Sequence, residues 1–504
     1  MQDGTLDRPH VALLPWGHTF EDFLDGLGVS FDQFCVEMTG GWLFGYVQAL
    51  QLAGFRITIF CFSTRTRVVV SRQHQPTGAE ICLIPANQSY RWMQQFFADP
   101  YAWETDKMFG RGKLPKIAKK FLRDVLPYFA TTPWALKRKL HRRAVGVILC
   151  QEYEYARFDV VTALGHLLGL PVFATFQGGN WQVSRLEKLT RPPAIGKCAG
   201  LIIGPATEAA RVQAKYGIRS DKIARLPNPL DLTEWEPMDR EKARETLGLP
   251  LTARIAISHG RIDIFRKGLD LLLDAWSRLR LSHPDQDWRL VLIGSGVDAS
   301  RFRSILCSRN DSSILWIDRY LRDRRLMRTW LSAADVYVMA SRHEGFPVAP
   351  LEGMACGLAV IATLVPGIAE IMGDEWPLPG IAVPIGDMPA LAGALERSLN
   401  DTPESRALGI RAKQRVQDFS LASVGRRLRD FLMAQMNCMV PEYASTIPRQ
   451  LAAGHTCRKP SDTNYIARQD IAEIVSADIN PAESDRNHHC DESCDHDNTL
   501  RLPL

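Results

Sequence analysis

A strand-to-helix unit in the carboxyl-terminal half of the chain limits the folds open to it. The apolar run at residues 336 to 340 predicts a buried strand, and residues 348 to 356 predict a helix that ends at Gly357. Pro347 and Pro350 fall in or beside the first helical turn, where a missing N–H costs little. Strand, short loop and helix form the unit from which parallel α/β sheets are built.

Two carboxylates, Glu344 and Glu352, are eight positions apart around this predicted helix start. A carboxylate offers up to about four lone-pair directions on a short stem, which suits pairs of sugar hydroxyls. The N–H groups of Gly345, Phe346 and Val348 at the helix start favour a phosphate. We interpret the segment as a sugar-nucleotide site, in which one carboxylate meets a sugar and the other a ribose. An ordinary amphipathic helix with two solvated glutamates is the alternative.

A second strand, at residues 254 to 260, runs into a basic turn. Arg261 and Lys267 are placed to clamp a diphosphate, since Arg offers a planar fork and Lys a compact point charge. Together they would neutralise a leaving group that gains negative charge. Without Glu344 nearby, a solvated basic turn would be the better interpretation. A third predicted strand, at residues 288 to 296, ends in Gly-x-Gly, which alone is a weak signal.

Together these residues resemble the retaining glycosyltransferases of family four, which have the two-domain GT-B fold. The resemblance covers roughly residues 8 to 435 and is more specific in the carboxyl half. It rests on Gly260-Arg261 with Lys267-Gly268, on the two glutamates with seven residues between them, and on an interdomain-like segment at residues 226 to 237. In that segment Asn228, Asp231 and Pro237 match, and Pro229 replaces the usual Gly.

The resemblance implies an α/β protein with two doubly wound Rossmann-like domains that face each other across a cleft. We expect an acceptor-binding domain at residues 1 to 229 and a nucleotide-sugar donor domain at residues 230 to 419. A helix at residues 420 to 440 would cross back onto the amino-terminal domain. Residues 441 to 504 are polar with scattered prolines and are predicted to be mostly disordered.

The implied activity is a hexosyl transfer from a nucleotide-diphosphate sugar to an acceptor hydroxyl with retention of configuration. Catalytic roles would fall to Glu344, Arg261 and Lys267. The resemblance implies a donor site formed by Glu352, Gly345, Phe346, Val348 and Gly260. It implies no cofactor and no metal. A sugar-nucleotide epimerase of the same fold and a non-catalytic membrane-binding or sugar-nucleotide-binding protein remain alternatives.

The amino half begins with a strand at residues 11 to 15, a helix at 42 to 53 and a strand at 56 to 62, a βαβ pattern. The polar stretch between the first strand and the helix ends in Gly40 and Gly41, which would let the backbone approach a phosphate or an acceptor. A simple helix-start turn is the alternative. Later strands are predicted at residues 145 to 150, 172 to 176 and 200 to 204.

Two polar positions follow these strands. Gln177 stands where related enzymes carry a histidine, and an amide does not titrate near neutral pH, so we expect no proton transfer there. Glu152 would bind an acceptor hydroxyl, unless it is a capping or solvated carboxylate. Each position lies at the edge of the predicted sheet where ligands bind.

Residues 107 to 143 hold twelve Lys or Arg against a single acid, Asp124. Interleaved apolar residues predict basic amphipathic helices able to lie on an anionic membrane surface. A solvated basic face and a groove for a polyanionic acceptor are the alternatives. Nucleic-acid binding is not expected, because no recognition motif accompanies the charge.

The composition agrees with a soluble globular chain. It has 504 residues, 46% hydrophobic and 23% charged, which fits two domains and a tail. Its eleven cysteines form no disulfide framework, and no apolar run is long enough to span a bilayer. We expect a cytoplasmic protein, with a peripheral membrane location open. His488 to His496 contains metal-ligand types, but the spacing fits no standard structural site.

Overall fold

The computed structural model describes residues 8–39, 41–97, 108–109, 115–178, 184–374, 377–400 and 402–439. Every described residue belongs to one compact unit. The predicted disordered tail and its His and Cys residues therefore lie outside the described part. Within the described ranges, no helix is long and apolar enough to cross a membrane.

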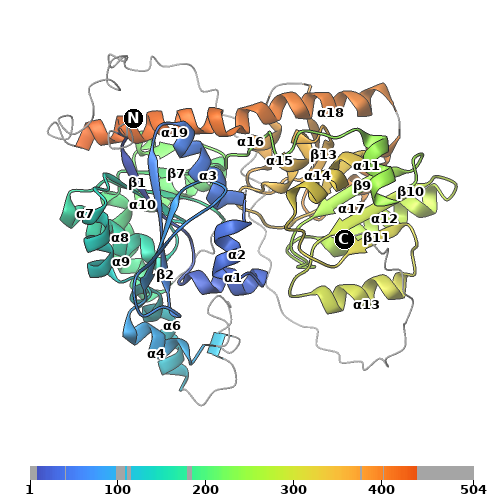
Figure 1. Ribbon diagram of the computed structural model, residues 1–504. Helices are drawn as coiled ribbons and strands as arrows, with labels where there is room; N and C mark the ends of the chain where they lie inside the picture. The colour runs from blue at the N-terminus through green and yellow to red at the C-terminus, as the bar shows by residue number, and fades with distance from the viewer. Residues whose placement is uncertain are drawn as a thin grey trace. The chain divides into compact units, whose positions relative to one another are not determined.

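The amino-terminal half is built on an eight-stranded sheet with the order β3-β4-β2-β1-β5-β6-β7-β8 (Figure 1). All neighbours are parallel except β3 and β4. Its strands are β1 (His10–Leu14), β2 (Arg56–Ser63), β3 (Val70–Gln73), β4 (Glu80–Pro85), β5 (Val147–Gln151), β6 (Val172–Thr175), β7 (Gly200–Ile202) and β8 (Ile223–Ala224). The sequence placed β1, β2, β5, β6 and β7 within a few residues of these bounds.

Helices cover both faces of this sheet. They are α1 (Phe20–Leu27), α2 (Phe31–Val36), α3 (Gly41–Leu52), α4 (Gln88–Gln94), α6 (Lys116–Phe129), α7 (Pro133–Arg142), α8 (Ala156–Leu168), α9 (Arg185–Lys197) and α10 (Ala206–Tyr216), with a short 3₁₀ turn η1 (Ser220–Lys222). One face carries a core with residues of α3, and the other a core with residues of α7 to α10. The sheet is therefore a doubly wound layer.

The stretch between β1 and α3 is not the simple polar connection that the sequence predicted, because it folds into α1 and α2. Ser30 forms a capping box at the start of α2, and the Asp22 carboxylate accepts from the backbone N–H of Thr19 at the start of α1. Phe20 and Phe34 pack edge to face, with ring centroids 4.7 Å apart. Caps and aromatic packing thus stabilise helices that are too short to give a clear periodic pattern.

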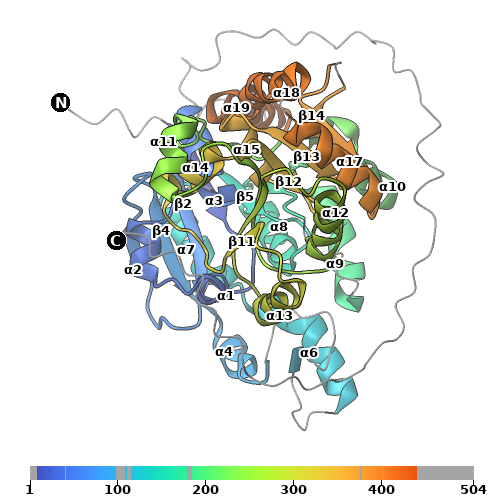
Figure 2. The same ribbon diagram turned by 90° about the vertical axis from the view of Figure 1, so that its right-hand side faces the viewer.

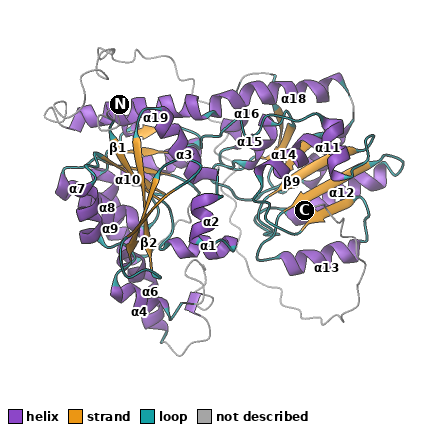
Figure 3. Ribbon diagram, viewed as in Figure 1, coloured by secondary structure: helices purple, strands orange, loops and turns teal. Residues whose placement is uncertain are grey.

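The second sheet has six parallel strands in the order β11-β10-β9-β12-β13-β14. They are β9 (Arg254–His259), β10 (Trp288–Ile293), β11 (Ile314–Ile317), β12 (Val336–Met339), β13 (Ala359–Thr363) and β14 (Gly380–Val383). Helices α11 (Arg240–Leu247), α12 (Leu269–Ser282), α13 (Ala299–Arg309), α14 (Arg324–Ala333), α15 (Ala349–Ala355), α16 (Ile368–Met372), α17 (Met388–Leu399) and α18 (Pro403–Arg415) accompany it (Figures 2 and 3).

The chain ends its described part in the 3₁₀ turn η2 (Val416–Phe419) and the helix α19 (Leu421–Met439). Although α19 follows the second sheet in sequence, it packs against α3. Leu428, Leu432 and Met436 are buried in the same core as Val47 and Leu50. The last helix therefore completes the core of the first sheet.

In both sheets the strand order reverses next to the first strand of the half. The reversal lies between β1 and β5 in the first sheet and between β9 and β12 in the second. Ligands of open α/β sheets bind at such reversal points, beyond the carboxyl ends of the strands. A ligand site is therefore expected at the loops after β9 and β12.

Candidate functional site

The loops after β9 and β12 lie against each other at the reversal point of the second sheet. Gly268, at φ +60°, ends the first loop, and a Cβ atom there would overlap the carbonyl of Ala340 at the start of the second. Only glycine adopts this conformation readily and allows this approach. The sequence motif Lys267-Gly268 thus has a geometric reason: the glycine lets the lysine reach the residues that follow β12.

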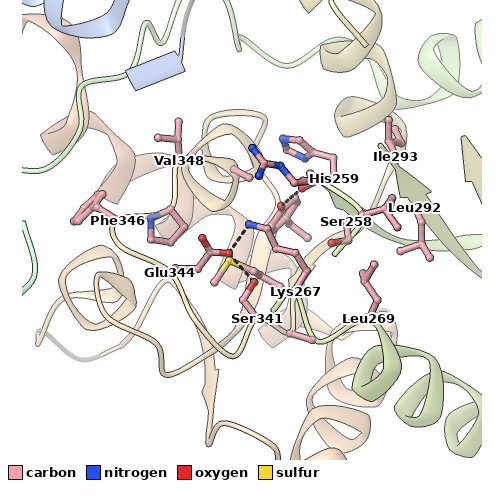
Figure 4. Close-up of a pocket in the computed structure, with 18 of the residues that line it drawn as sticks. Ser258, His259, Lys267, Leu269, Leu292, Ile293, Ser341, Glu344, Phe346 and Val348 are labelled. Carbon is pink, nitrogen blue, oxygen red and sulfur yellow. Dashed lines mark hydrogen bonds and ion pairs between the residues drawn. The ribbon is translucent and has the colours of Figure 1, made fainter. Parts of the chain in front are cut away.

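A cavity of about 220 Å³ opens at this point (Figure 4). Half of the residues that line it belong to the two loops, and most of the others lie on β9, β10, β12 and the helix starts of α12 and α15. Gln177 and Asn228 come from the part of the chain before β9. The sequence-predicted residues that line the cavity are Gly260, Arg261, Lys267, Glu344, Phe346, Val348 and Gln177. Residues predicted from separate motifs are therefore neighbours in space.

Glu344 is held in place on the cavity wall. The Lys267 ammonium lies 2.6 Å from its Oε1 atom, and the Ser341 hydroxyl donates to the same oxygen at 2.7 Å (Figure 4). The carboxylate belongs to a buried residue, and the Thr363 hydroxyl donates to the carbonyl of Ser341 behind it. The second carboxylate oxygen is left for a further donor such as a hydroxyl.

Arg261 is an exposed cation of the cavity. Its guanidinium makes no hydrogen bond or ion pair with any residue in the described part of the chain. Lys267, by contrast, is paired with Glu344. The cavity thus presents one guanidinium and one ammonium, and the guanidinium is available to an anion without breaking any existing contact.

Glu352 lies in a neighbouring pocket of about 100 Å³, which shares His259 with the first cavity. Its Oε2 atom is 2.7 Å from Nε2 of His259, and its Oε1 atom accepts from Arg324 at 3.2 Å. Burial raises the pKa of Glu352, but the hydrogen bonds and charges of His259 and Arg324 outweigh it, so the pKa lies below its usual range. His259 and Arg324 therefore hold the Glu352 side chain in place as a carboxylate.

Arg324 is a residue of this site that sequence reasoning missed. Besides Glu352, it donates to the backbone carbonyl of Thr39 at 3.0 Å, and its guanidinium lies 5.1 Å from the ring centroid of Trp235. Arg324 is the first residue of α14, directly after the helix cap Asp323. The local sequence therefore predicts a helix start there but no ligand contact. The partners of Arg324 are distant in sequence, so no spacing rule could have found it.

The glycine pair of the amino half is only partly described. Gly40 lies outside the described residues, and Gly41 is the first residue of α3. Thr39, just before them, is the residue whose carbonyl accepts from Arg324. The predicted phosphate or acceptor contact of this pair stays a prediction.

Gln177 and Glu152 differ in their position relative to the cavity. Gln177 lines the cavity, and its amide donates to Thr175 at 3.1 Å. Glu152 is buried, at φ +80°, and its two carboxylate oxygens accept from the backbone N–H groups of Gln177 at 2.9 Å and Glu154 at 3.2 Å. It does not line the cavity. The Glu152 carboxylate thus positions the backbone of Gln177. Its predicted contact with an acceptor hydroxyl stays a prediction.

The loop that carries Glu344 also contacts residues from before β9. A Cβ atom on Gly178 would lie 2.8 Å from Cα of Gly345, and the Asn228 amide donates to the Phe346 carbonyl at 3.3 Å. Phe346 itself lies against Gly204, where no Cβ would fit without moving its ring. These contacts hold the predicted donor loop against the amino half.

Within the described part of the chain, no group of three or more His, Cys, Asp or Glu side chains could hold a metal ion. That the reaction requires no metal ion stays a prediction. The positive charge that the described cavity offers comes from Arg261 and Lys267.

Comparisons with known proteins agree with the family resemblance that the motifs of the second sheet predicted. Residues 253–401 match the family model described as glycosyl transferases group 1. The D-inositol 3-phosphate glycosyltransferase of Pseudarthrobacter chlorophenolicus is 30% identical over 241 residues, which cover 43% of this chain and 57% of that protein. The chain thus aligns with less than two thirds of that relative. The predicted resemblance is supported over residues 253–401.

Solved structures share the fold of both halves. Sucrose-phosphate synthase (tll1590) from Thermosynechococcus elongatus has a TM-score of 0.61 at 21% identity and covers 86% of this chain and 100% of its own. Anabaena Alr3699/HepE, in complex with UDP and glucose, has a TM-score of 0.56 at 14% identity and covers 84% and 100%. The predicted GT-B fold, with two Rossmann-like α/β domains, is confirmed.

Proposed function

We propose that this protein is a retaining hexosyltransferase, which moves a sugar from a nucleotide-diphosphate sugar to an acceptor hydroxyl. The observation that carries the proposal is that one cavity holds both the exposed Arg261 and the Lys267–Glu344 ion pair. These groups lie at the reversal point of the second sheet, within the segment that matches the group 1 model. Cations that meet a diphosphate and a carboxylate that meets sugar hydroxyls are what such a donor requires.

In this mechanism Arg261 binds the diphosphate directly. Lys267 turns from Glu344 to the phosphate when the donor enters, which frees the carboxylate to accept from sugar hydroxyls. Glu352, held by His259 and Arg324, accepts from the ribose. Arg261 and Lys267 then stabilise the negative charge that grows on the leaving phosphate, the kind of interaction that lowers a barrier most.

The transfer itself breaks the bond between the anomeric carbon and the phosphate oxygen and forms a bond to the acceptor oxygen. We propose that the acceptor attacks the face from which the phosphate leaves, which retains the configuration. The departing phosphate takes the acceptor's proton. No side chain then needs to titrate, in agreement with a glutamine, Gln177, on the cavity wall.

The proposal extends to cofactors and acceptors. We propose that no divalent metal is needed, because two side-chain cations neutralise the diphosphate. The acceptor is expected to be a sugar, a lipid-linked saccharide or a small molecule, in polysaccharide, glycolipid or glycoside synthesis. The working place would be the cytoplasm, at the membrane face when the acceptor is lipid-linked. Because the HepE structure holds UDP and glucose, UDP-glucose is the donor to test first.

Product analysis tests this proposal. The full chain is incubated with UDP-glucose and other nucleotide sugars, with and without an acceptor panel, and NMR follows the anomeric signals. Acceptor-dependent release of nucleotide with a retained anomeric configuration is expected, and chelation of divalent metals should not slow it. An epimerised sugar nucleotide formed without any acceptor would instead identify the epimerase. Inverted product, or a strict metal requirement, would contradict the mechanism.

A further inference from the structure

Helix α6 carries an outward face of paired apolar and basic side chains. Ile117 and Phe121 are 85% and 63% exposed, and they are one helical turn apart. Lys116 and Lys120 are exposed with the same spacing. Residues four apart on a helix are neighbours, so these four side chains form one patch, here named the α6 patch. Exposed apolar side chains that adjoin one another beside polar residues are the arrangement found at interaction surfaces, when the patch is extended by a partner or a bilayer.

The rest of α6 is anchored in the protein, so the α6 patch is not needed to hold the helix. Leu126 is buried in a cluster with Tyr90 of α4. The Asp124 carboxylate pairs with Arg123 at 2.9 Å and accepts from the backbone N–H of Arg185 at 3.4 Å. Packing and hydrogen bonds therefore fix α6 through its other faces. Figure 2 shows α4 and α6 as neighbours at the lower edge of the view.

The charge on α6 itself is mostly positive. Asp124 is the single acid of this helix, and it pairs with Arg123. Lys116 and Lys120 of the α6 patch are exposed. Exposed lysines attract an anionic surface over roughly 10 Å in physiological salt.

We propose that the α6 patch docks on an anionic lipid bilayer. Ile117 and Phe121 would enter the boundary between head groups and acyl chains, while Lys116 and Lys120 would meet lipid phosphates. A polyanion such as a nucleic acid would satisfy the lysines but leave both apolar side chains in water. A bilayer satisfies both kinds of side chain, which is why the observations favour it. The inference does not depend on the proposed sugar transfer.

Vesicle sedimentation with the full chain tests the inference. Vesicles of phosphatidylcholine are compared with vesicles that also contain phosphatidylglycerol. The variants are Ile117→Ser with Phe121→Ser, Lys116→Glu with Lys120→Glu, and the control Leu281→Ser, since Leu281 is 84% exposed on α12. We expect binding to the anionic vesicles, weakened at least about tenfold by either double variant and unchanged in the control.

Two results would overturn the inference. One is a parent protein that does not sediment with anionic vesicles. The other is an Ile117→Ser, Phe121→Ser variant that binds them as tightly as the parent, because the patch would then be a site for polyanions only. Thermal midpoints and nucleotide binding of each variant are measured alongside and should match the parent. A failure of the membrane surface is thereby distinguished from a failure of the donor site.

Discussion

At the scale of single residues, Lys267 has the clearest expected effect on catalysis. Its ammonium would stabilise charge that appears only as the donor bond breaks, so its loss should lower kcat more than donor binding. We expect Lys267→Ala to lose about 3 kcal/mol of transition-state stabilisation, or about a hundredfold in rate. Nucleotide release at saturating donor measures this. Lys242→Ala, an exposed lysine of α11, is the control. Activity of Lys267→Ala within about threefold of the parent would contradict the assignment.

Arg324 should act on donor binding rather than on the chemical step. It holds Glu352 on one side and the carbonyl of Thr39 on the other, so its removal leaves the ribose carboxylate less well placed. Arg324→Met is expected to raise the donor KM about tenfold with little change in kcat, as a lost charge-assisted hydrogen bond would. The exposed neighbour Arg325 provides the control Arg325→Met. Equal effects in both variants would argue against a role in positioning.

The lowered pKa of Glu352 predicts a pH dependence of stability. A carboxyl whose pKa is depressed in the folded state stabilises the protein above its unfolded pKa, and this contribution disappears as the pH falls through the folded value. The free energy of unfolding of the parent relative to Glu352→Gln should therefore stay constant from neutral pH to about 4.5 and then decline. Urea unfolding at stepped pH measures it. If the parent instead gained stability relative to Glu352→Gln as the pH falls, the pairing of Glu352 with His259 and Arg324 would be contradicted.

At the scale of elements, the loop after β12 depends on glycine where it meets Gly178. A Cβ atom on Gly345 would overlap the Gly178 backbone, so Gly345→Ala must push the two segments apart and displace Glu344. Since small misplacements of a reacting group are costly, we expect kcat/KM to fall on the order of a hundredfold. Gly146→Ala is the control, because no atom lies within 4 Å of its Cβ position. Steady-state kinetics of both variants decide the matter.

The elements also show which features a sequence can predict. Strands buried on both faces, such as β9 and β12, give continuous apolar runs, and the glycines and prolines after them mark the loops. Those two runs were enough to predict where Arg261, Lys267 and Glu344 would gather. Helices α1 and α2 were missed because each has only two turns or so, and capping fixes them rather than periodicity.

The contacts that tune the site could not be predicted in this way. His259 is 93 positions from Glu352, and Thr39 is 285 positions from Arg324. Such contacts depend on how the strands are ordered in space, which no local pattern encodes. Glu152 illustrates the same limit, because its positive φ and its two backbone partners are not visible in the polar cluster that drew attention to it.

At the scale of the whole molecule, α19 makes the stability of the first sheet depend on the end of the described chain. Leu428 is fully buried against residues of α3. Leu428→Ala should cost about 2 to 5 kcal/mol, through lost transfer free energy and the cavity left behind. Leu281→Ala, at an exposed position of α12, should leave stability nearly unchanged. Thermal denaturation compares them, and similar midpoints for both variants would contradict the packing role of α19.

The central claim is that the cavity beyond the carboxyl ends of β9 and β12 binds a nucleoside diphosphate through Arg261 and Lys267. The most direct test is thermal stabilisation of the full chain by UDP, GDP and ADP, since a ligand at a hundredfold excess over its Kd adds about 2.7 kcal/mol. We predict that one nucleotide raises the midpoint of the parent and of Lys242→Ala equally, and that Arg261→Ala loses most of the rise. No shift with any nucleotide at millimolar concentration, or an undiminished shift in Arg261→Ala, would contradict the account.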